Sequence, residues 1–135
     1  AALKERLPKN RAFTFLDIGS GFGTMLLHIG KQFPSGRFTG VEISPLAVFI
    51  SKIRSLFAKN VATKARSLWN EDLSQYDFVY AFLSPTPMPE LWSKVQNEMR
   101  PGTWFLVNSF RVEVEADEVF EIPGTRQVLY CYRID

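Results

Sequence analysis

The sequence is poor in the residues that build disulfides and metal centres. Of its 135 residues, one is a cysteine, Cys131, and one is a histidine, His28. A single cysteine excludes an internal disulfide, and the pair cannot supply a zinc site of cysteine and histidine ligands. The sequence also lacks a run of 18 apolar residues and a signal-like start. We therefore expect a soluble, cytoplasmic protein without a metal ion.

The sequence also has almost no excess of charge of one sign. The formal net charge is +2, and like charges form no long block, which disfavours a nucleic-acid-binding arm or an acidic tail. Hydrophobic residues make up 46% of the chain and aromatic residues 14%, enough for one sizeable core. Residues 1–135 are thus expected to form a single domain that binds no nucleic acid.

Three segments repeat apolar residues at the spacing of one helix face. They are Phe22, Met25, Leu26, Ile29 and Phe33; Leu46, Phe49, Ile50, Ile53 and Phe57; and Met88, Leu91, Trp92, Val95 and Met99. Ser44 and Pro45 are typical of a helix start, and Pro101 with Gly102 is typical of the residues just after a helix end. The pattern predicts three amphipathic helices.

Between these segments lie short apolar runs rich in β-branched and aromatic residues. They begin at residues 13, 37, 77 and 103, and a more polar run begins at residue 61. Such runs suit parallel strands buried on both faces, with the polar one near the sheet edge. The last two runs, 113–123 and 126–134, have no helix between them, which indicates a hairpin at Pro123 and Gly124. An α/β fold is predicted, with a mostly parallel sheet that ends in an antiparallel hairpin.

A glycine-rich loop follows the first predicted strand. Gly19, Gly21 and Gly23 alternate with other residues directly after Asp17. This position is the floor of the ligand crevice in an open α/β sheet. The spacing lacks the third glycine of a dinucleotide fingerprint, because Thr24 stands there. An acid before the loop disfavours a pyrophosphate and suits a ligand with a cationic amine.

An acid also ends the second predicted strand. Glu42 lies 19 residues after Gly23, the position from which a carboxylate accepts hydrogen bonds from the two hydroxyls of an adenosine ribose. Together the loop and Glu42 favour a ligand that carries a ribose and an amine.

These motifs resemble those of the class I S-adenosylmethionine-dependent methyltransferases over nearly the whole chain. In this chain, LDIGSGFGT is similar to the first motif of that family and GVEIS to the second. ARSLWNEDL is similar to the third motif and YDFVYAFLSP to the fourth. A narrower resemblance links GVEISP and MRPGTWFLVNSF to small bacterial relatives of mitochondrial and archaeal protein-lysine methyltransferases, which include the enzyme that modifies the c-subunit of ATP synthase. The resemblance implies a Rossmann-like sheet of order 3-2-1-4-5-7-6 and an enzyme that converts S-adenosylmethionine to S-adenosylhomocysteine.

The resemblance also implies a role for individual residues. Asp17 and Gly19 would approach the methionine part, Gly21 and Gly23 would shape the loop, and Glu42 would hold the ribose. Ser20 and Ile43, which adjoin these residues, would also bind the cofactor. Ser67 and Leu68 would flank the adenine. The segment Ser84, Pro85 and Thr86 replaces the Asn/Asp-Pro-Pro-aromatic loop of many amino-group methyltransferases, and we expect it to position the methyl acceptor without proton transfer. Phe82, Asn108 and Phe110 are further candidates for the acceptor channel.

The resemblance makes a protein lysine the expected acceptor. A small-molecule methyltransferase, a non-catalytic nucleoside-binding domain and a dinucleotide-dependent oxidoreductase are the alternatives, and the last is disfavoured by Asp17 and Thr24. Several of the related enzymes carry a hydrophobic segment ahead of this domain. Because the sequence starts without methionine, a membrane tether upstream of residue 1 stays open.

Overall fold

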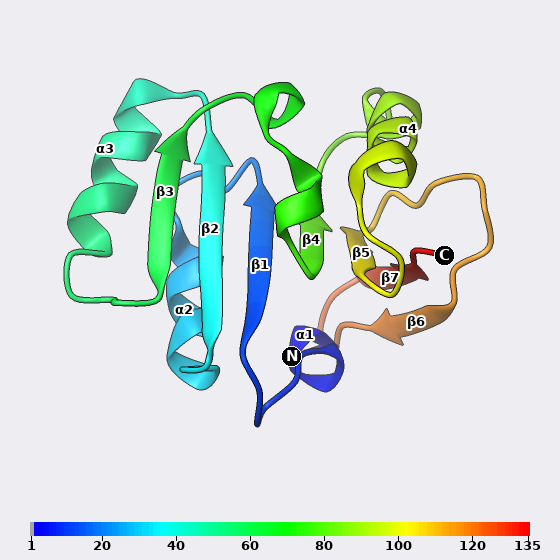
Figure 1. Ribbon diagram of the computed structural model, residues 1–135, viewed down its shortest axis with the longest axis horizontal. Coiled ribbons are helices and arrows are strands. Elements are labelled where there is room, and N and C mark those ends of the chain that lie inside the picture. The colour runs from blue at the N-terminus through cyan, green and yellow to red at the C-terminus, as the bar shows by residue number, and fades with distance from the viewer. Residues whose placement is uncertain (1) are drawn as a thin grey trace. The chain divides into compact units, whose positions relative to one another are not determined.

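The structure is a computed structural model that describes residues 2–135, except for the side chains of Ala2 and Glu5. Its helices are α1 (Ala2–Arg6), α2 (Thr24–Gln32), α3 (Pro45–Arg54) and α4 (Met88–Glu98), with two 3-10 turns at Leu68–Asn70 and Leu73–Gln75. Its strands are β1 (Phe13–Ile18), β2 (Gly36–Glu42), β3 (Val61–Ala65), β4 (Phe78–Ala81), β5 (Trp104–Asn108), β6 (Glu118–Glu121) and β7 (Val128–Arg133) (Figure 1).

The seven strands follow the order β3-β2-β1-β4-β5-β7-β6, as predicted. The pairs β1–β2, β2–β3 and β4–β5 are parallel, whereas β7 runs antiparallel to both β5 and β6. The polar strand β3 lies at one edge, which confirms its predicted place. The fold class inferred from the sequence is therefore confirmed.

The chain divides into two compact units, residues 8–71 and residues 72–135 with 1–7. In the first unit, α2 and α3 both pack on β2 and β3. Phe13, Phe15 and Phe38 are buried in its core, and the ring of Phe13 meets that of Phe38 edge to face at 5.6 Å. Burial of these large side chains is the main stabilisation of the unit.

In the second unit, Trp92 of α4 stacks on Phe105 of β5 and contacts Tyr132 of β7. The predicted hairpin turn is confirmed, but its first strand is shorter than expected, because β6 begins only at Glu118. Asp117 ends the ladder there: its carboxylate accepts a 2.7 Å hydrogen bond from the backbone N–H of Arg133, so a side chain takes the place of a strand partner.

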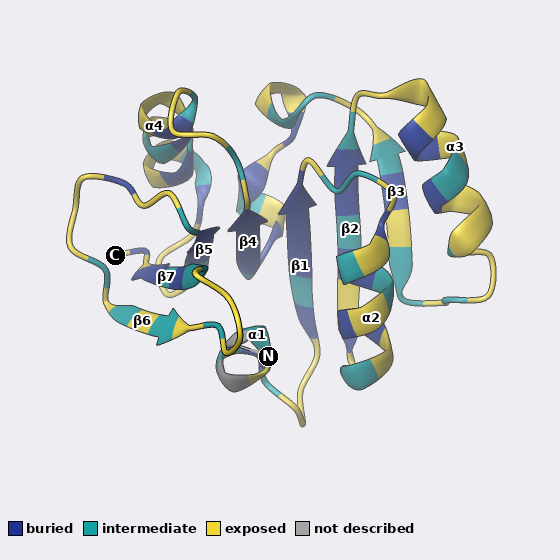
Figure 2. Cartoon of the chain, turned by 180° about the vertical axis from the view of Figure 1, so that it is seen from behind, coloured by how far each residue is buried: buried dark blue, intermediate teal, exposed yellow. Residues whose placement is uncertain are grey.

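The helix α3 differs from the usual amphipathic arrangement. Ser44 caps its N-terminus by accepting a hydrogen bond from the Ala47 N–H, and Pro45 is its first residue, as predicted. Four residues of the apolar stripe identified in the sequence, Leu46, Phe49, Ile53 and Phe57, are exposed, however. Ile50 is half-buried, and the buried face consists of Ala47, Val48 and Ser51. Figure 2 shows exposed residues along much of α3. Small residues face the sheet because α3 approaches the glycine loop closely, as Ser51 demonstrates below.

None of the helices in residues 2–135 is long and apolar enough to cross a lipid bilayer.

Candidate functional site

The loop between β1 and α2 is held in a conformation that favours glycine. Gly19, Gly21 and Gly23 have φ angles of 72°, 58° and 77°. The backbone N–H groups of Gly19 and Ser20 both donate to the carbonyl of Val41, at 3.0 and 3.2 Å. A side-chain methyl at Gly21 would meet nothing within 4 Å. The main chain at Gly21 therefore borders open space that a ligand can enter.

Glu42, at the end of β2, is bonded to this loop. Its Oε1 accepts a 2.9 Å hydrogen bond from the Gly21 N–H, and its Oε2 accepts from the N–H groups of Ile43 and Ser44, each at 2.9 Å. An ionised carboxylate offers about four acceptor positions, so one position on Oε1 is left for a ligand hydroxyl. A grip on both hydroxyls of a ribose requires one of the three backbone bonds to open.

Asp17 is buried at the end of β1, with 6% of its surface exposed. Burial, and secondly the negative charge of Glu42, raise the pKa of its carboxyl group from 3.8 to about 8. Desolvation disfavours the charged form, and a second carboxylate nearby adds to that effect. A cationic group placed beside Asp17 would favour the ionised carboxylate and so oppose the effects of burial and of Glu42. The site is therefore suited to an amine.

Ser20 lies differently from its predicted neighbours. Its hydroxyl is buried without a hydrogen-bond partner among the described residues, and it packs against Gly40 of β2, where a methyl group would come within 2.5 Å of it. The side chain is therefore directed at the sheet, and only the backbone of Ser20 belongs to the open side of the loop.

Two residues of α3 support the loop from behind. The Ser51 hydroxyl donates a 2.9 Å hydrogen bond to the carbonyl of Gly21, and a guanidinium nitrogen of Arg54 donates to the Phe22 carbonyl and to Thr24 Oγ1 at 3.2 and 2.9 Å. The sequence did not predict these positioning residues, because their spacing identifies a helix face and not its tertiary partner.

Beyond β3, the segment that carries Ser67 and Leu68 is fixed by a buried acid. Glu71, whose side chain is 2% exposed, accepts from Lys64 at 3.1 Å and from Arg66 at 2.8 Å. In the sequence, Glu71 is marked only as the first acid after a basic stretch. That position alone was insufficient to predict that it pairs with Lys64 and Arg66. Ser67 caps the 3-10 turn at Leu68–Asn70 through the Trp69 N–H, so its hydroxyl is partly committed to the turn.

Ile43 and Ser67 line a common surface cavity of about 440 Å³. The other residues around it are Pro45, Val48, Phe49, Lys52, Ala65 and Arg66. Two residues predicted to bind the cofactor thus come together, within residues 8–71. The cavity is mostly apolar in its side chains, which suits a flat heterocycle.

The predicted acceptor residues lie in the second unit. Ser84, Pro85 and Thr86 form an exposed segment between β4 and α4. Two half-exposed aromatic rings, Phe82 and Phe110, follow the carboxyl ends of the neighbouring strands β4 and β5.

Asn108 is less suited to contact an acceptor. It is buried, and its amide donates to Tyr80 Oη at 3.0 Å and to Gln127 Oε1 at 3.3 Å. The next residue, Ser109, was not predicted from the sequence. It has a φ of 71°, a strained value for a residue with a side chain, and strain of this kind concentrates at functional sites.

The arrangement provides binding and orientation, and offers little acid–base chemistry. Among residues 2–135, no three His, Cys, Asp or Glu side chains are grouped so that they could hold a metal ion. His28 is exposed and shares a hydrogen bond with Gln32. Cys131 is buried, and burial raises the pKa of its thiol to about 12, which makes it a poor nucleophile.

Comparison with known families agrees with this geometry. The family model described as the ANTKMT methyltransferase domain matches residues 17–117, from Asp17 of the loop to Asp117 at the start of the hairpin. The chain belongs to this methyltransferase family. The resemblance inferred from the motifs is therefore confirmed at the level of the family.

Two curated relatives give the range of similarity. A lysine N-methyltransferase of the ATP synthase c-subunit from Mus musculus is 32% identical over 102 residues, which cover 72% of this chain and 40% of that protein. The protein of the same name from Caenorhabditis elegans is 31% identical over 104 residues, which cover 75% and 53%. The chain thus spans about half the length of the curated relatives it matches, or less.

Solved structures share the fold. The crystal structure of an RNA methyltransferase from Salinibacter ruber in complex with S-adenosyl-L-homocysteine matches with a TM-score of 0.82 and 22% identity, covering 90% of this chain and 80% of that one. The structure of PKMT2 from Rickettsia typhi matches with a TM-score of 0.62 and 21% identity, covering 73% and 21%. At these identities the likeness concerns the fold alone.

Proposed function

We propose that this protein is an S-adenosylmethionine-dependent methyltransferase. One observation carries the proposal: the Glu42 carboxylate holds the bare main chain of Gly21 beside a buried Asp17. Such a site presents an acceptor for a ribose hydroxyl and a carboxyl group that ionises beside a cationic amine, and the family to which the chain belongs is one of methyltransferases. Its residues fit S-adenosylmethionine, whose adenosine has the ribose and whose methionine has the amine.

The proposed roles follow the positions of the side chains. Asp17 and the loop from Gly19 to Gly23 bind the methionine part, with Ser20 contributing its backbone. Glu42 binds the ribose through the free acceptor position of Oε1. Ile43, Ser67 and Leu68 border the adenine, in the cavity that the first two line. Trp69 is 41% exposed, so its ring is accessible to a base.

A protein lysine is the proposed acceptor. Support comes from the names of the curated relatives, which describe lysine methylation of the ATP synthase c-subunit. When bound, S-adenosylmethionine supplies a methyl group that is already activated by its sulfonium, so the protein has only to align a neutral amine with it. Ser84, Pro85 and Thr86 would position that amine. Exposed apolar rings such as Phe82 and Phe110 would disfavour the ammonium form and lower the lysine pKa.

The cofactor assignment is tested by thermal unfolding with S-adenosylhomocysteine, S-adenosylmethionine and NAD. A ligand at 100 times its dissociation constant adds roughly 2.7 kcal/mol to the free energy of unfolding. Stabilisation by the first two compounds and not by NAD supports the proposal. Stabilisation by NAD alone would indicate an oxidoreductase.

The acceptor assignment needs a separate experiment. The protein is incubated with methyl-labelled S-adenosylmethionine and with membrane and cytosol extracts, with the Glu42→Ala variant as the control. Label in protein, released as methyllysine after hydrolysis, supports the lysine assignment. Label only in metabolites points to a small-molecule acceptor, and binding without any transfer points to a non-catalytic domain. A cytoplasmic location stays a prediction from the sequence.

A further inference from the structure

The outer face of α3 and its C-terminal turn carries a continuous row of large apolar side chains. We call the row the α3 stripe; it consists of Leu46, Phe49, Ile53, Leu56 and Phe57. Leu46, Phe49 and Ile53 are three or four residues apart and so share one helix face. Leu56 and Phe57 follow in the turn after α3. Phe57 is 97% exposed and Leu56 is 72% exposed. Single exposed apolar residues are ordinary, but a contiguous row usually marks an interaction surface.

The protein cannot bury the α3 stripe by rotating the helix. The opposite face is fixed by Ser51, whose hydroxyl donates to the Gly21 carbonyl, and Gly23 lies so close that a methyl group there would be 3.3 Å from Ser51 Oγ. Rotation would break this bond and distort the glycine loop. The stripe is therefore presented outward by the same contacts that order the loop.

The charged residues of the chain segment that carries the α3 stripe are all positive. Between Glu42 and Glu71 the sequence has no acid and five basic residues. Two of them, Lys64 and Arg66, are paired with Glu71. The other three are Lys52, Arg54 and Lys59, which are exposed. At 100° per residue, Lys52 and Arg54 lie on opposite sides of the stripe, so an apolar centre is bordered by cations.

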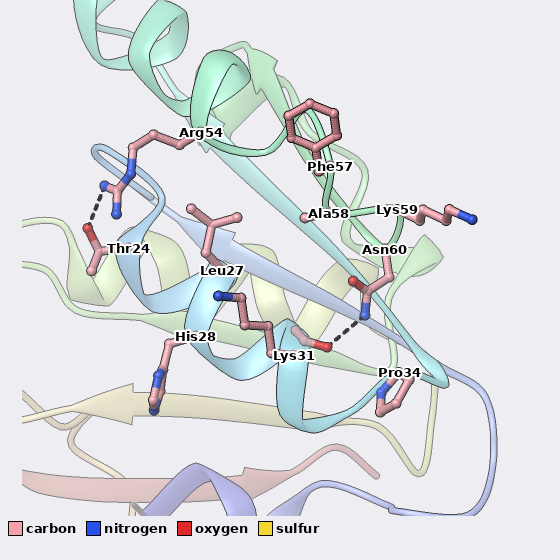
Figure 3. A pocket seen from close by; sticks show the side chains of 11 residues that line it. Thr24, Leu27, His28, Lys31, Pro34, Arg54, Phe57, Ala58, Lys59 and Asn60 are labelled. Carbon is pink, nitrogen blue, oxygen red and sulfur yellow. Dashed lines mark hydrogen bonds between the residues drawn. The ribbon is translucent and has the colours of Figure 1, made fainter.

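A cavity of about 760 Å³ lies at the C-terminal end of the α3 stripe, between α2 and the turn that follows α3 (Figure 3). Phe57 forms part of its wall, together with three cationic side chains, Lys31, Arg54 and Lys59. Figure 3 shows the guanidinium of Arg54 bound to Thr24 at one end of the cavity and the Asn60 amide bonded at the other. An anionic group of the size of a phosphate fits such a cation-lined cavity next to an apolar ring.

We propose that the α3 stripe and this cavity form a docking surface for an anionic lipid membrane. Leu56 and Phe57 enter the boundary between headgroups and acyl chains, and Lys31, Arg54 and Lys59 meet the lipid phosphates. Apolar side chains flanked by lysine and arginine are what binding in the membrane interface requires. Phe49 and Lys52 also line the cavity proposed for the adenine. The inference rests on Leu56, Phe57, Lys31 and Lys59, which lie outside that cavity, and so does not depend on the reaction that the protein catalyses.

Two other occupants fit the surface less well. A nucleic acid would use stacking aromatic residues beside the cations, whereas three of the five side chains in the stripe are aliphatic. A second copy that docks symmetrically through the same face would bring Lys52, Arg54 and Lys59 of one protomer against those of the other. The charge pattern therefore favours an anionic lipid surface.

The test is flotation of the protein with vesicles, using phosphatidylcholine alone and phosphatidylcholine mixed with phosphatidylglycerol. The wild type is expected to bind the mixed vesicles and to bind the zwitterionic ones at least tenfold more weakly. The double variant Leu56→Ser/Phe57→Ser should lose at least tenfold in affinity for the mixed vesicles. Lys31→Gln/Lys59→Gln should also weaken binding and reduce its dependence on salt.

The matched control is Val114→Ser/Val119→Ser, which removes two exposed apolar side chains from the other unit and should bind as the wild type does. An unchanged thermal unfolding midpoint establishes that each variant is folded. The proposal is overturned if the wild type does not float with the mixed vesicles, or if the control loses as much binding as Leu56→Ser/Phe57→Ser. It is also overturned if the stripe variant abolishes a lipid-free dimer or RNA binding while vesicle binding persists.

Discussion

The backbone N–H of Gly21 donates a 2.9 Å hydrogen bond to Oε1 of Glu42, 21 residues later in the chain. This bond joins the glycine loop after β1 to the end of β2, and Ser51 of α3 bonds to the carbonyl of the same glycine. The two peptide groups that flank the Cα of Gly21 are thus fixed, one by Glu42 and the other by Ser51.

Glu42→Gln tests the carboxylate. The variant keeps the size of the side chain but replaces one acceptor oxygen by an NH₂ group, which faces a backbone N–H. We expect a loss of about 1–3 kcal/mol in the free energy of unfolding and at least a tenfold loss of affinity for S-adenosylhomocysteine. Urea unfolding and calorimetric titration measure the two effects. Glu121→Gln, an exposed strand acid, is the control, and equal affinity in both variants would exclude Glu42 from the cofactor site.

Asp17→Asn tests the buried acid through pH. Because the Asp17 pKa is raised to about 8, the folded protein keeps this proton over a range in which the unfolded chain has released it. Asp17 therefore stabilises the fold most at low pH, and this contribution is lost as the pH rises from about 4 to 8. Asn cannot ionise, so the variant should gain stability relative to wild type between pH 5 and pH 8, by at least ~1 kcal/mol.

The measurement is urea unfolding of both proteins at several pH values. A stability difference that does not change with pH would contradict the raised pKa. The same residue predicts that S-adenosylhomocysteine binding releases a proton from wild type at neutral pH and none from Asp17→Asn, because the ligand amine favours the ionised carboxylate. Calorimetry in two buffers of different ionisation enthalpy detects that proton.

Gly21→Ala and Gly124→Ala form a matched pair. Both glycines have positive φ angles, 58° and 78°, and a methyl group at either would meet nothing within 4 Å. Each substitution should cost about 1–2 kcal/mol of stability for the left-handed backbone. Only Gly21→Ala should abolish cofactor binding, because its methyl group fills the space proposed for the ligand. Equal binding by the two variants would mean that this space is not the cofactor site.

Ser51→Ala tests the support from α3. Loss of its hydrogen bond to Gly21 should cost about 1 kcal/mol and weaken S-adenosylhomocysteine binding several-fold. Ser55→Ala is the control, since the hydroxyl of Ser55, the residue that follows α3, has only a long 3.4 Å bond to the carbonyl of Lys52. The contribution of Ser51 is refuted if both variants bind alike.

The sequence predicted the strands of the sheet and the acid at the end of β2, because short apolar runs between helical repeats leave few alternative arrangements. The spacing of apolar residues located α3 but did not show which of its faces packs on the sheet. The stripe from Leu46 to Phe57 has the spacing of a core face, yet the close approach of Ser51 to the glycine loop requires small residues on the inner side. That requirement is tertiary and has no signature in the spacing of apolar residues.

The site was predictable to a similar extent. Asp17, Gly21 and Glu42 were selected as candidates because their positions relative to the strands carry information, and their role in cofactor binding stays a prediction. The sequence could not predict how many acceptor positions remain free on Glu42. The other positions are occupied by the backbone N–H groups of Gly21, Ile43 and Ser44, which are aligned only in the folded loop. The same holds for Glu71, whose partners Lys64 and Arg66 depend on the path of the chain after β3.

A crystal structure of the protein with S-adenosylhomocysteine tests the central claim most directly. We predict a ribose hydroxyl within hydrogen-bond distance of Glu42 Oε1, the amine of the ligand beside Asp17, and the main chain of Gly21 against the ligand. A ligand bound away from these residues, or a loop closed over Gly21 by packed side chains, would contradict the proposed site.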